Sequence, residues 1–306
     1  MITIKTRRLD RITVVRASYS QAAEQAALNA LGIVKDFAKN GDLKTITKKH
    51  ATSFVKSYPG EKEGTGISFD FFSIKGRLAV AISFNPYKLS DDDWADFLGM
   101  LEVVFENGPS EVWSNFKLSR LEVAMDVKVP FQELVCVVPK ITVVDPQYWT
   151  KGTLYLGHRY GARSYCIYDK RKQLAEKKVV DLGHDLTRVE VTLRGTGKTL
   201  GQFSTLCKPF GDLVVVRKSS VIGLQKKSPT SIELSMLVKG VLAGGIAQNI
   251  YLDMDSYSRK LLLKRLKSVA LNLNGTFDDW NGWVERQVQM LETRFLGASV
   301  QLAAPN

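Results

Sequence analysis

The chain has 306 residues, with 43 Lys and Arg against 31 Asp and Glu, so its formal net charge is +12. A positive surplus of this size favours a polyanionic partner, most often nucleic acid, with a basic enzyme that lacks such a partner as the alternative. The 44% hydrophobic content supports a core and excludes a disordered chain. Three cysteines without CxxC spacing exclude a disulfide scaffold and a cysteine zinc site, and they favour a reduced, cytoplasmic setting. The N-terminus lacks the apolar run of a signal peptide, and no stretch approaches the ~18 apolar residues of a membrane span.

The first 130 residues predict strands and helices in alternation, from apolar periodicity and helix-capping residues. The Lys75-Gly76-Arg77 turn between two apolar runs predicts a hairpin. Ser90 followed by three aspartates predicts the start of a helix, since acids suit the first turn. The expected elements are a strand at 9–17, a helix capped by Ser18 or Ser20 and reaching about residue 38, a loop at 39–66 with room for a short strand at 52–55, the hairpin 67–74 and 78–84, a helix from Ser90 that Asn107-Gly108-Pro109 ends, and a strand at 120–127.

The next stretch resembles a repeat of this order, with a hairpin at 153–168, a helix at about 169–179 and a strand at 188–194. The pattern predicts an α+β fold in which helices pack on one face of an antiparallel sheet. From residue 231 the chain becomes helical. The predicted division is an α+β domain at 1–195 with halves at about 1–130 and 150–195, a linker or peripheral strands at 196–230, and a helical module at 231–306 with helices at 232–242, 256–273 and 278–295.

Three carboxylates on two of these strands allow a divalent metal site. Glu122 and Asp126 alternate onto the non-core face of one strand, and Glu190 takes the equivalent face of the other. Hard oxygen donors suit Mg²⁺ or Mn²⁺, which can polarise a phosphoryl oxygen. Glu122 and Asp126 lie about 13 Å apart by strand rise, so a straight strand cannot bring both to one ion. The plainer alternative is cross-strand ion pairs with Arg120 and Arg188.

Four tyrosines, at positions 155, 160, 165 and 168, fall within fourteen residues. Most strand tyrosines simply pack, with the hydroxyl at the rim. A phenol near a metal or a Lys or Arg side chain ionises more readily and becomes a nucleophile. Tyr168 precedes a basic run, and Tyr165 faces the other side of the same strand, so only one of the two can face the carboxylates.

The sequence excludes two other kinds of functional motif. Gly195–Thr199 mimics a phosphate-binding loop, but Thr192 stands where that loop requires its first glycine. The three histidines are isolated, which excludes a histidine-rich metal motif. His158, Arg159 and Arg163 are better suited to contact phosphate.

Four short blocks between residues 119 and 194 resemble motifs of one family. These are Ser119–Asp126, Thr153–Arg159, Ser164–Lys170 with Gln173, and Leu186–Glu190. In the same order they are similar to the T-R-(I/L)-D-(I/L)-A-x-D, T-x-Y-x-G-x-R, R-I-Y-D-K-x-x-Q/E and R-(V/F)-E segments of the replication initiation factor family of the Rep_trans type. Glu122 departs from the usual Asp, and Cys166 stands where Arg or a bulkier residue is common.

The resemblance implies a Rep nuclease-like fold and a rolling-circle replication initiator of plasmid or filamentous-phage type. Such a protein binds an origin, as duplex and as hairpin or single strand, and cuts one strand with a tyrosine. The tyrosine stays on the 5′-phosphate and leaves a 3′-OH primer, assisted by Mg²⁺ or Mn²⁺. A host helicase would unwind the DNA, and a homodimer is left open. The alternatives are a conjugative relaxase of the same family and a DNA-binding regulator without catalysis.

Carried onto this sequence, the resemblance implies Tyr168 as the nucleophile, with Tyr165 as second choice. It implies Glu190 and Glu122 as metal ligands, with Asp126 binding or orienting the metal. Lys170 and Arg188 would steady phosphate charge. The residues expected to contact DNA are basic and lie on or beside these blocks: Arg159, Arg163, Arg171, Lys172, Arg188 and Arg194.

Overall fold

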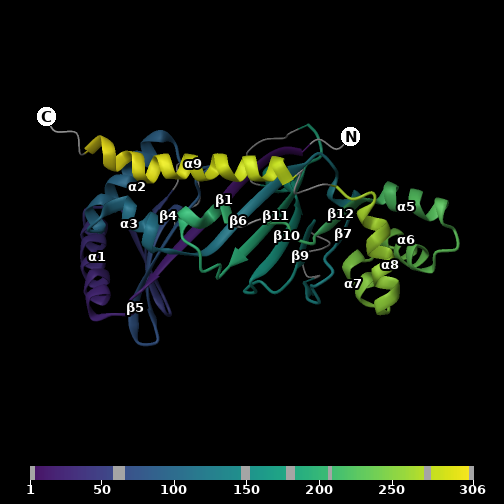
Figure 1. Cartoon of the computed structure of the whole chain (residues 1–306), viewed down its shortest axis with the longest axis horizontal. Coiled ribbons are helices and arrows are strands. Elements are labelled where there is room, and N and C mark those ends of the chain that lie inside the picture. Colours follow the sequence, from purple (N-terminus) through teal and green to yellow (C-terminus); the bar gives the residue numbers. More distant parts are fainter. Residues whose placement is uncertain are drawn as a thin grey trace. The chain divides into compact units, whose positions relative to one another are not determined.

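The computed structural model describes residues 4–57, 66–145, 152–176, 183–205, 209–271 and 277–302. The fold is α+β with a large antiparallel sheet, as predicted (Figure 1). The chain divides into two compact units. The first unit holds Met1–Arg8, Val123–Thr192 and Lys208–Phe277, and the second holds Leu9–Glu122, Leu193–Cys207 and Asp278–Asn306.

Strands of the second unit are hydrogen-bonded in the order β2-β3-β4-β5-β1. Their bounds are β1 Ile4–Ala17, which begins in the first unit, β2 Lys44–Lys48, β3 Ala51–Ser57, β4 Gly66–Ile74 and β5 Arg77–Phe84. The predicted hairpin is confirmed, and its turn places Lys75 and Gly76 at φ of 51° and 79°, the twist that suits a two-residue hairpin. The prediction of a loop at 39–66 is wrong in part, because β2 and β3 both fall within it. Strand β2 is largely exposed and has one apolar residue, Ile46, so it gives almost no apolar alternation.

The helices of the second unit are α1 Gln21–Lys39, α2 Asp91–Val104, α3 Gly108–Asn115 and most of α9 Phe277–Leu302. Ser20 caps α1, and Ser90 forms a capping box with Asp93 at the start of α2, as the sequence predicted. The Asn107-Gly108-Pro109 segment was expected only to end a helix. It follows α2 and also starts α3, because proline suits the first turn of a helix.

Aromatic side chains form much of the core of this unit. Phe295 of α9 lies 5.9 Å from Phe84 and 6.1 Å from Trp94 between ring centroids. Phe97 of α2 lies 5.1 Å from Phe84, and Trp113 of α3 lies 6.0 Å from Phe295. Such tilted and edge-on pairs add to the stabilisation from burial, so α9 is fixed on this core through Phe295.

In the first unit the strand order is β6-β11-β10-β9-β8. Their bounds are β6 Lys117–Val127, β8 Val144–Asp145, β9 Thr153–Leu156, β10 Arg163–Asp169 and β11 Thr187–Arg194, with β6 and β11 reaching into the second unit. Helix α4, Lys170–Glu176, follows β10 directly. These strands and this helix confirm the elements predicted at 120–127, 153–168 and 188–194, while residues 177–179 of the predicted helix lie outside the described residues.

The remainder of the first unit is mainly helical. A two-stranded sheet of β7 Leu134–Val137 and β12 Val214–Arg217 packs with α5 Lys218–Lys227, α6 Ile232–Leu242, α7 Ala247–Leu252 and α8 Ser256–Lys267. The alternating valines of both strands share a buried core with leucines of α6 and α8. Helix α8 ends at Lys267, six residues before the predicted end. The 3-10 turns are η1 Phe131–Glu133 and η3 Leu200–Thr205.

The helices predicted for the C-terminal module are divided between the units, with α6 to α8 in the first and α9 almost wholly in the second. None of the helices in the described part of the chain has the length and apolar character needed to cross a bilayer.

Candidate functional site

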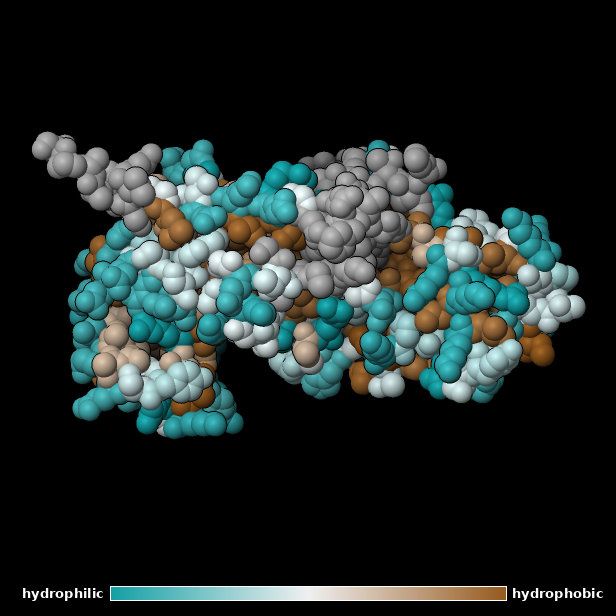
Figure 2. Space-filling model, in the orientation of Figure 1, coloured by the Kyte–Doolittle hydropathy of each residue, from teal (hydrophilic) through white to brown (hydrophobic). Residues whose placement is uncertain are grey.

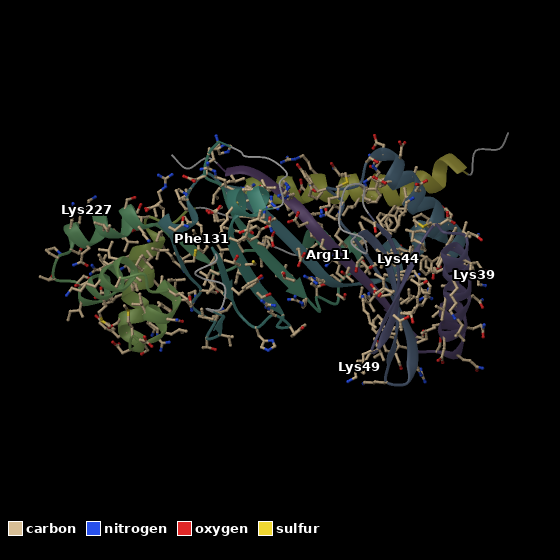
Figure 3. All side chains as sticks on the ribbon, turned by 180° about the vertical axis from the view of Figure 1, so that it is seen from behind. Arg11, Lys39, Lys44, Lys49, Phe131 and Lys227 are labelled. Carbon is tan, nitrogen blue, oxygen red and sulfur yellow. The ribbon has the colours of Figure 1, made fainter. Side chains whose placement is uncertain are left out.

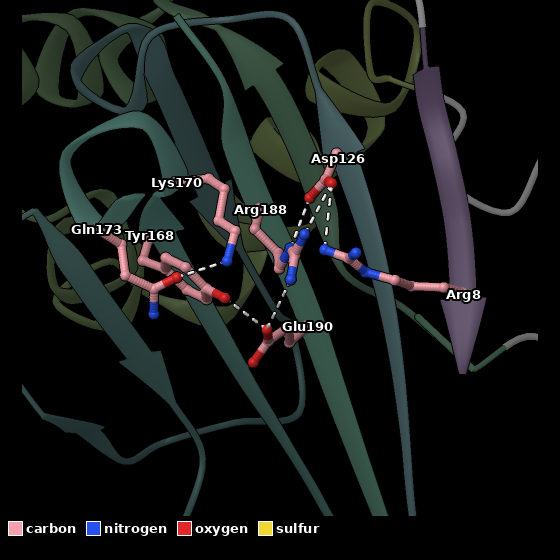
Figure 4. Close-up of polar contacts among 7 residues, drawn as sticks. All are labelled: Arg8, Asp126, Tyr168, Lys170, Gln173, Arg188 and Glu190. Carbon is pink, nitrogen blue, oxygen red and sulfur yellow. Dashed lines mark hydrogen bonds and ion pairs between the residues drawn. The ribbon is translucent and has the colours of Figure 1, made fainter. Parts of the chain in front are cut away.

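A tyrosine and a glutamate lie together on neighbouring strands of the first unit (Figure 4). The Tyr168 hydroxyl on β10 donates a hydrogen bond of 2.7 Å to Oε1 of Glu190 on β11. The Tyr168 side chain is buried, whereas the Glu190 side chain is 23% exposed. The phenol therefore meets a carboxylate that solvent still reaches.

An ion-pair network lies beside this pair. Arg188, two residues before Glu190 and on the same face of β11, donates to Asp126 of β6 through Nε at 2.6 Å and Nη2 at 2.8 Å. Arg8 of β1 donates to the same carboxylate at 3.4 Å. Nη1 of Arg188 lies 4.0 Å from Oε1 of Glu190. A nearly buried arginine thus links Asp126 to the Tyr168–Glu190 pair.

Helix α4 supplies a further cation. Its first residue, Lys170, donates through Nζ to Oε1 of Gln173 at 2.6 Å, and Nζ lies 5.7 Å from the Tyr168 ring centroid. The strand-to-helix transition is fixed by backbone bonds, because Asp169 donates to Gly152 and Lys170 donates to Leu186. Lys170 is therefore held beside the phenol by the geometry of the turn.

Tyr165 has a different environment. Its hydroxyl donates to the Phe210 carbonyl at 2.8 Å, and its side chain is 2% exposed. Burial raises the pKa of Tyr165, against the opposing influence of Arg163. Gly211, at φ 55°, packs closely against Arg163 and Tyr165. A Cβ added at Gly211 would collide with the Arg163 guanidinium and would lie 3.2 Å from the Tyr165 hydroxyl oxygen. Tyr165 is thus enclosed on the face of β10 opposite to Tyr168.

Tyr155 of β9 was counted among the clustered tyrosines but given no role by the sequence. It stands directly opposite Cys166, so it shares the Tyr168 face of the sheet. Burial, and next the neighbouring Cys166, raise the pKa of Tyr155 to about 12. The Arg159 guanidinium lies 4.6 Å from its ring centroid, which places one predicted DNA contact beside this phenol.

The predicted metal ligands are not gathered around one point. Glu122 forms an ion pair with Arg120, two residues earlier on β6, and both Asp126 oxygens accept from arginines. Across the described ranges, no group of three or more His, Cys, Asp or Glu side chains is arranged to hold a metal ion. As placed, these carboxylates do not fit a divalent cation, because arginines already neutralise two of them.

The other predicted DNA-contacting residues are spread over the structure. Arg171 pairs with Asp185 at 3.5 Å on the surface, and Lys172 is exposed. Arg188 is buried in its pair with Asp126. Arg194 lines a polar cleft in the second unit.

Sequence reasoning missed Arg8. It lies on β1, 118 positions from its partner Asp126. The strand itself was predicted only from residue 9, so no signal connected the two.

In comparisons with known proteins, neither a protein-family model nor a curated protein sequence matches this chain.

Proposed function

We propose that this protein nicks one strand of DNA, with Tyr168 as nucleophile and Glu190 as its general base. The observation that carries the proposal is the 2.7 Å hydrogen bond from the Tyr168 hydroxyl to the Glu190 carboxylate. A base must lie within hydrogen-bond reach of the proton that it removes, and this one does. Positive charge lies close by on Lys170, whose Nζ is 5.7 Å from the Tyr168 ring centroid, whereas Arg188 is held in its pair with Asp126. Developing negative charge on a phosphoryl group would be stabilised there.

The proposed step is a transesterification. The Tyr168 oxygen attacks phosphorus as its proton passes to Glu190, and the bond between phosphorus and the 3′ oxygen breaks. The released 3′ oxygen takes a proton from water, leaving a 3′-OH and a 5′-phosphotyrosine link. The phosphodiester energy is retained in that link, so rejoining needs no nucleotide cofactor.

DNA as the partner is supported by the distribution of positive charge as well as its total. Helix α8 contains five Lys or Arg residues and no acidic residue. Its buried side carries Leu262 and Leu266, while Lys260, Lys264 and Lys267 are exposed at helical spacing on the opposite side. Figure 2 shows hydrophilic residues, with hydrophobic ones between them, over this part of the first unit. Such a stripe suits contact with a phosphate backbone.

A fold of two related halves is part of the same proposal. The order hairpin, helix and strand occurs twice along the chain, first as β4, β5, α2 and β6 after the intervening α3, then as β9, β10, α4 and β11. This recurrence supports two related halves of the kind that the Rep_trans resemblance implies. We propose that the protein initiates rolling-circle replication. A conjugative relaxase would use the same chemistry.

A nicking assay tests the proposal. Supercoiled origin DNA incubated with the protein and Mn²⁺ should be converted to nicked circles, and Tyr168→Phe should abolish the conversion because it removes the nucleophilic oxygen. Tyr165→Phe is the matched control and should keep nicking activity. If Tyr168→Phe nicks as fast as the unaltered protein, Tyr168 is not the nucleophile.

A requirement for Mg²⁺ or Mn²⁺ remains a prediction from the resemblance, and the proposed attack by Tyr168 uses Glu190 alone as its base. A chelator arm of the same assay tests it: loss of nicking would support a metal requirement, and unchanged nicking would count against it. If the unaltered protein nicks no origin-bearing DNA but still binds it, the reading as a DNA-binding regulator replaces this proposal.

A further inference from the structure

The second unit contains a polar cleft of ≈ 410 Å³. Val55 is the one large apolar side chain and Asp70 the one acid among the described residues that line it. The cations that line it come from four strands: Arg11, Lys48, Arg120 and Arg194. Hydroxyl groups of serines and a threonine fill much of the remaining surface. A lining of cations and hydroxyls matches the side chains that contact phosphate and sugar in protein–DNA complexes.

Some of this charge is already neutralised. Lys48 pairs with Asp70 at 3.3 Å, and Asp70 also accepts from Ser68 at 2.9 Å and from Ser53. Arg120 pairs with Glu122. Among the described residues that line the cleft, four are cations and Asp70 is the one acid, so the lining itself is predominantly basic.

Arg11 stands apart from the other cations. It lies on β1 (Figure 3), partly exposed. No hydrogen bond or ion pair joins its side chain to another residue in the portion of the chain that the structure describes. A guanidinium without a carboxylate partner, in a cleft of hydroxyls, is suited to accept an anion from outside.

We propose that this cleft binds the phosphodiester backbone of a single nucleic-acid strand, with Arg11 as a principal contact. Its volume is within the range that admits a group of nucleotide size, whereas a duplex would reach only its rim. No aromatic side chain lines it among the described residues, so base stacking is not provided and the contact does not depend on sequence. The inference shares with the proposed function only the class of partner and needs no nicking step.

The test is the binding of a fluorescein-labelled oligothymidine, followed by fluorescence anisotropy over a range of salt concentrations. Arg11→Gln should lower the affinity about fivefold near 0.1 M salt, because one lost phosphate contact removes about 0.7 from the salt slope for a single strand. Arg11→Lys should restore most of the binding. Lys35→Gln is the matched control, since it removes one charge from the exposed surface of α1 in the same unit.

Melting temperatures of all three variants establish that they are folded. Unchanged binding by folded Arg11→Gln would overturn the proposal, as would an equal loss in Lys35→Gln, which would show an effect of net charge alone. The nicking assay separates the two proposals. If Tyr168→Phe binds oligothymidine normally but does not nick, the nicking proposal and the cleft proposal are both supported. If the unaltered protein never nicks but its binding depends on Arg11, only the proposal of strand binding in the cleft is supported.

Discussion

At the scale of single residues, the Asp126–Arg188 pair explains how a charged group is tolerated behind the Tyr168–Glu190 pair. Both side chains are less than a tenth exposed, at 9% and 6%, and the arginine donates two hydrogen bonds to the carboxylate. Two parallel bonds of this kind satisfy both charges and fix the orientation of Arg188. Arg188 is therefore best understood as holding the site in shape.

Removing one partner of this pair should be costly. Asp126→Asn is expected to lower the free energy of unfolding by about 3 kcal/mol, because it removes the negative charge that is hydrogen-bonded twice to a buried guanidinium. Urea denaturation measures the loss. Asp185→Asn is the control, since it breaks the exposed pair with Arg171 and should cost less than about 1 kcal/mol. Equal effects of the two substitutions would contradict the role given to Asp126.

Cys136 gives a prediction about pH. Burial raises the pKa of its thiol from 9.0 to about 12. A raised pKa means that the folded state favours the neutral thiol, so this contribution to stability is present below pH 9 and is lost as the pH rises toward 12. At pH 8, iodoacetamide should leave Cys136 unmodified in the folded protein and modify it once urea unfolds the chain. Rapid modification of the folded protein, detected by mass spectrometry, would contradict its burial.

At the scale of elements, the alternation of side chains between the two faces of β10 could be predicted from the sequence, whereas the pairing of β10 with β11 could not. Tyr165 and Tyr168 are three positions apart, so the sequence alone required that they face opposite sides. Which side meets Glu190 depends on the pairing of β10 with β11, which joins segments more than twenty residues apart. Local periodicity carries no information about such pairing. The buried amide of Gln248 was missed for the same reason, since it binds Val138 and Ile141 far along the chain.

Helix α8 allows an element-scale test of nucleic-acid binding. Lys260→Gln combined with Lys264→Gln should reduce the salt slope of duplex DNA binding by about 2, because each lost phosphate contact removes about 1. Anisotropy with a labelled duplex measures the slope. Lys35→Gln with Lys39→Gln removes the same charge from α1 and should leave the slope unchanged. An unchanged slope in the α8 variant would show that this helix does not contact DNA.

At the scale of the whole molecule, the α+β class followed from the order of predicted strands and helices, and the grouping of those elements did not. Helix α9 was expected to join the other C-terminal helices, yet Phe295 packs with Phe84 and Trp94 in the second unit. Apolar periodicity shows that a helix has a buried face, but not which core will bury it. Arg8 was missed similarly, since its partner is distant in sequence.

The net charge of +12 is the property of the whole chain that predicts a polyanionic partner. The basic stripe of α8 and Arg11, which has no hydrogen-bond or ion-pair partner among the described residues, are two places where that charge is available to a ligand. Charge of this kind supports binding, whereas the proposed reaction depends on one phenol and one carboxylate.

The central claim is most directly tested by locating the residue that becomes linked to DNA. An oligonucleotide that spans the nick is reacted with the protein, the covalent adduct is digested, and mass spectrometry identifies the modified peptide. The proposed reaction predicts a nucleotide attached through its 5′-phosphate to Tyr168, because this hydroxyl is hydrogen-bonded to Glu190 while that of Tyr165 is held by Phe210. Attachment to Tyr165 or Tyr155, or no adduct with DNA that the protein binds, would contradict it.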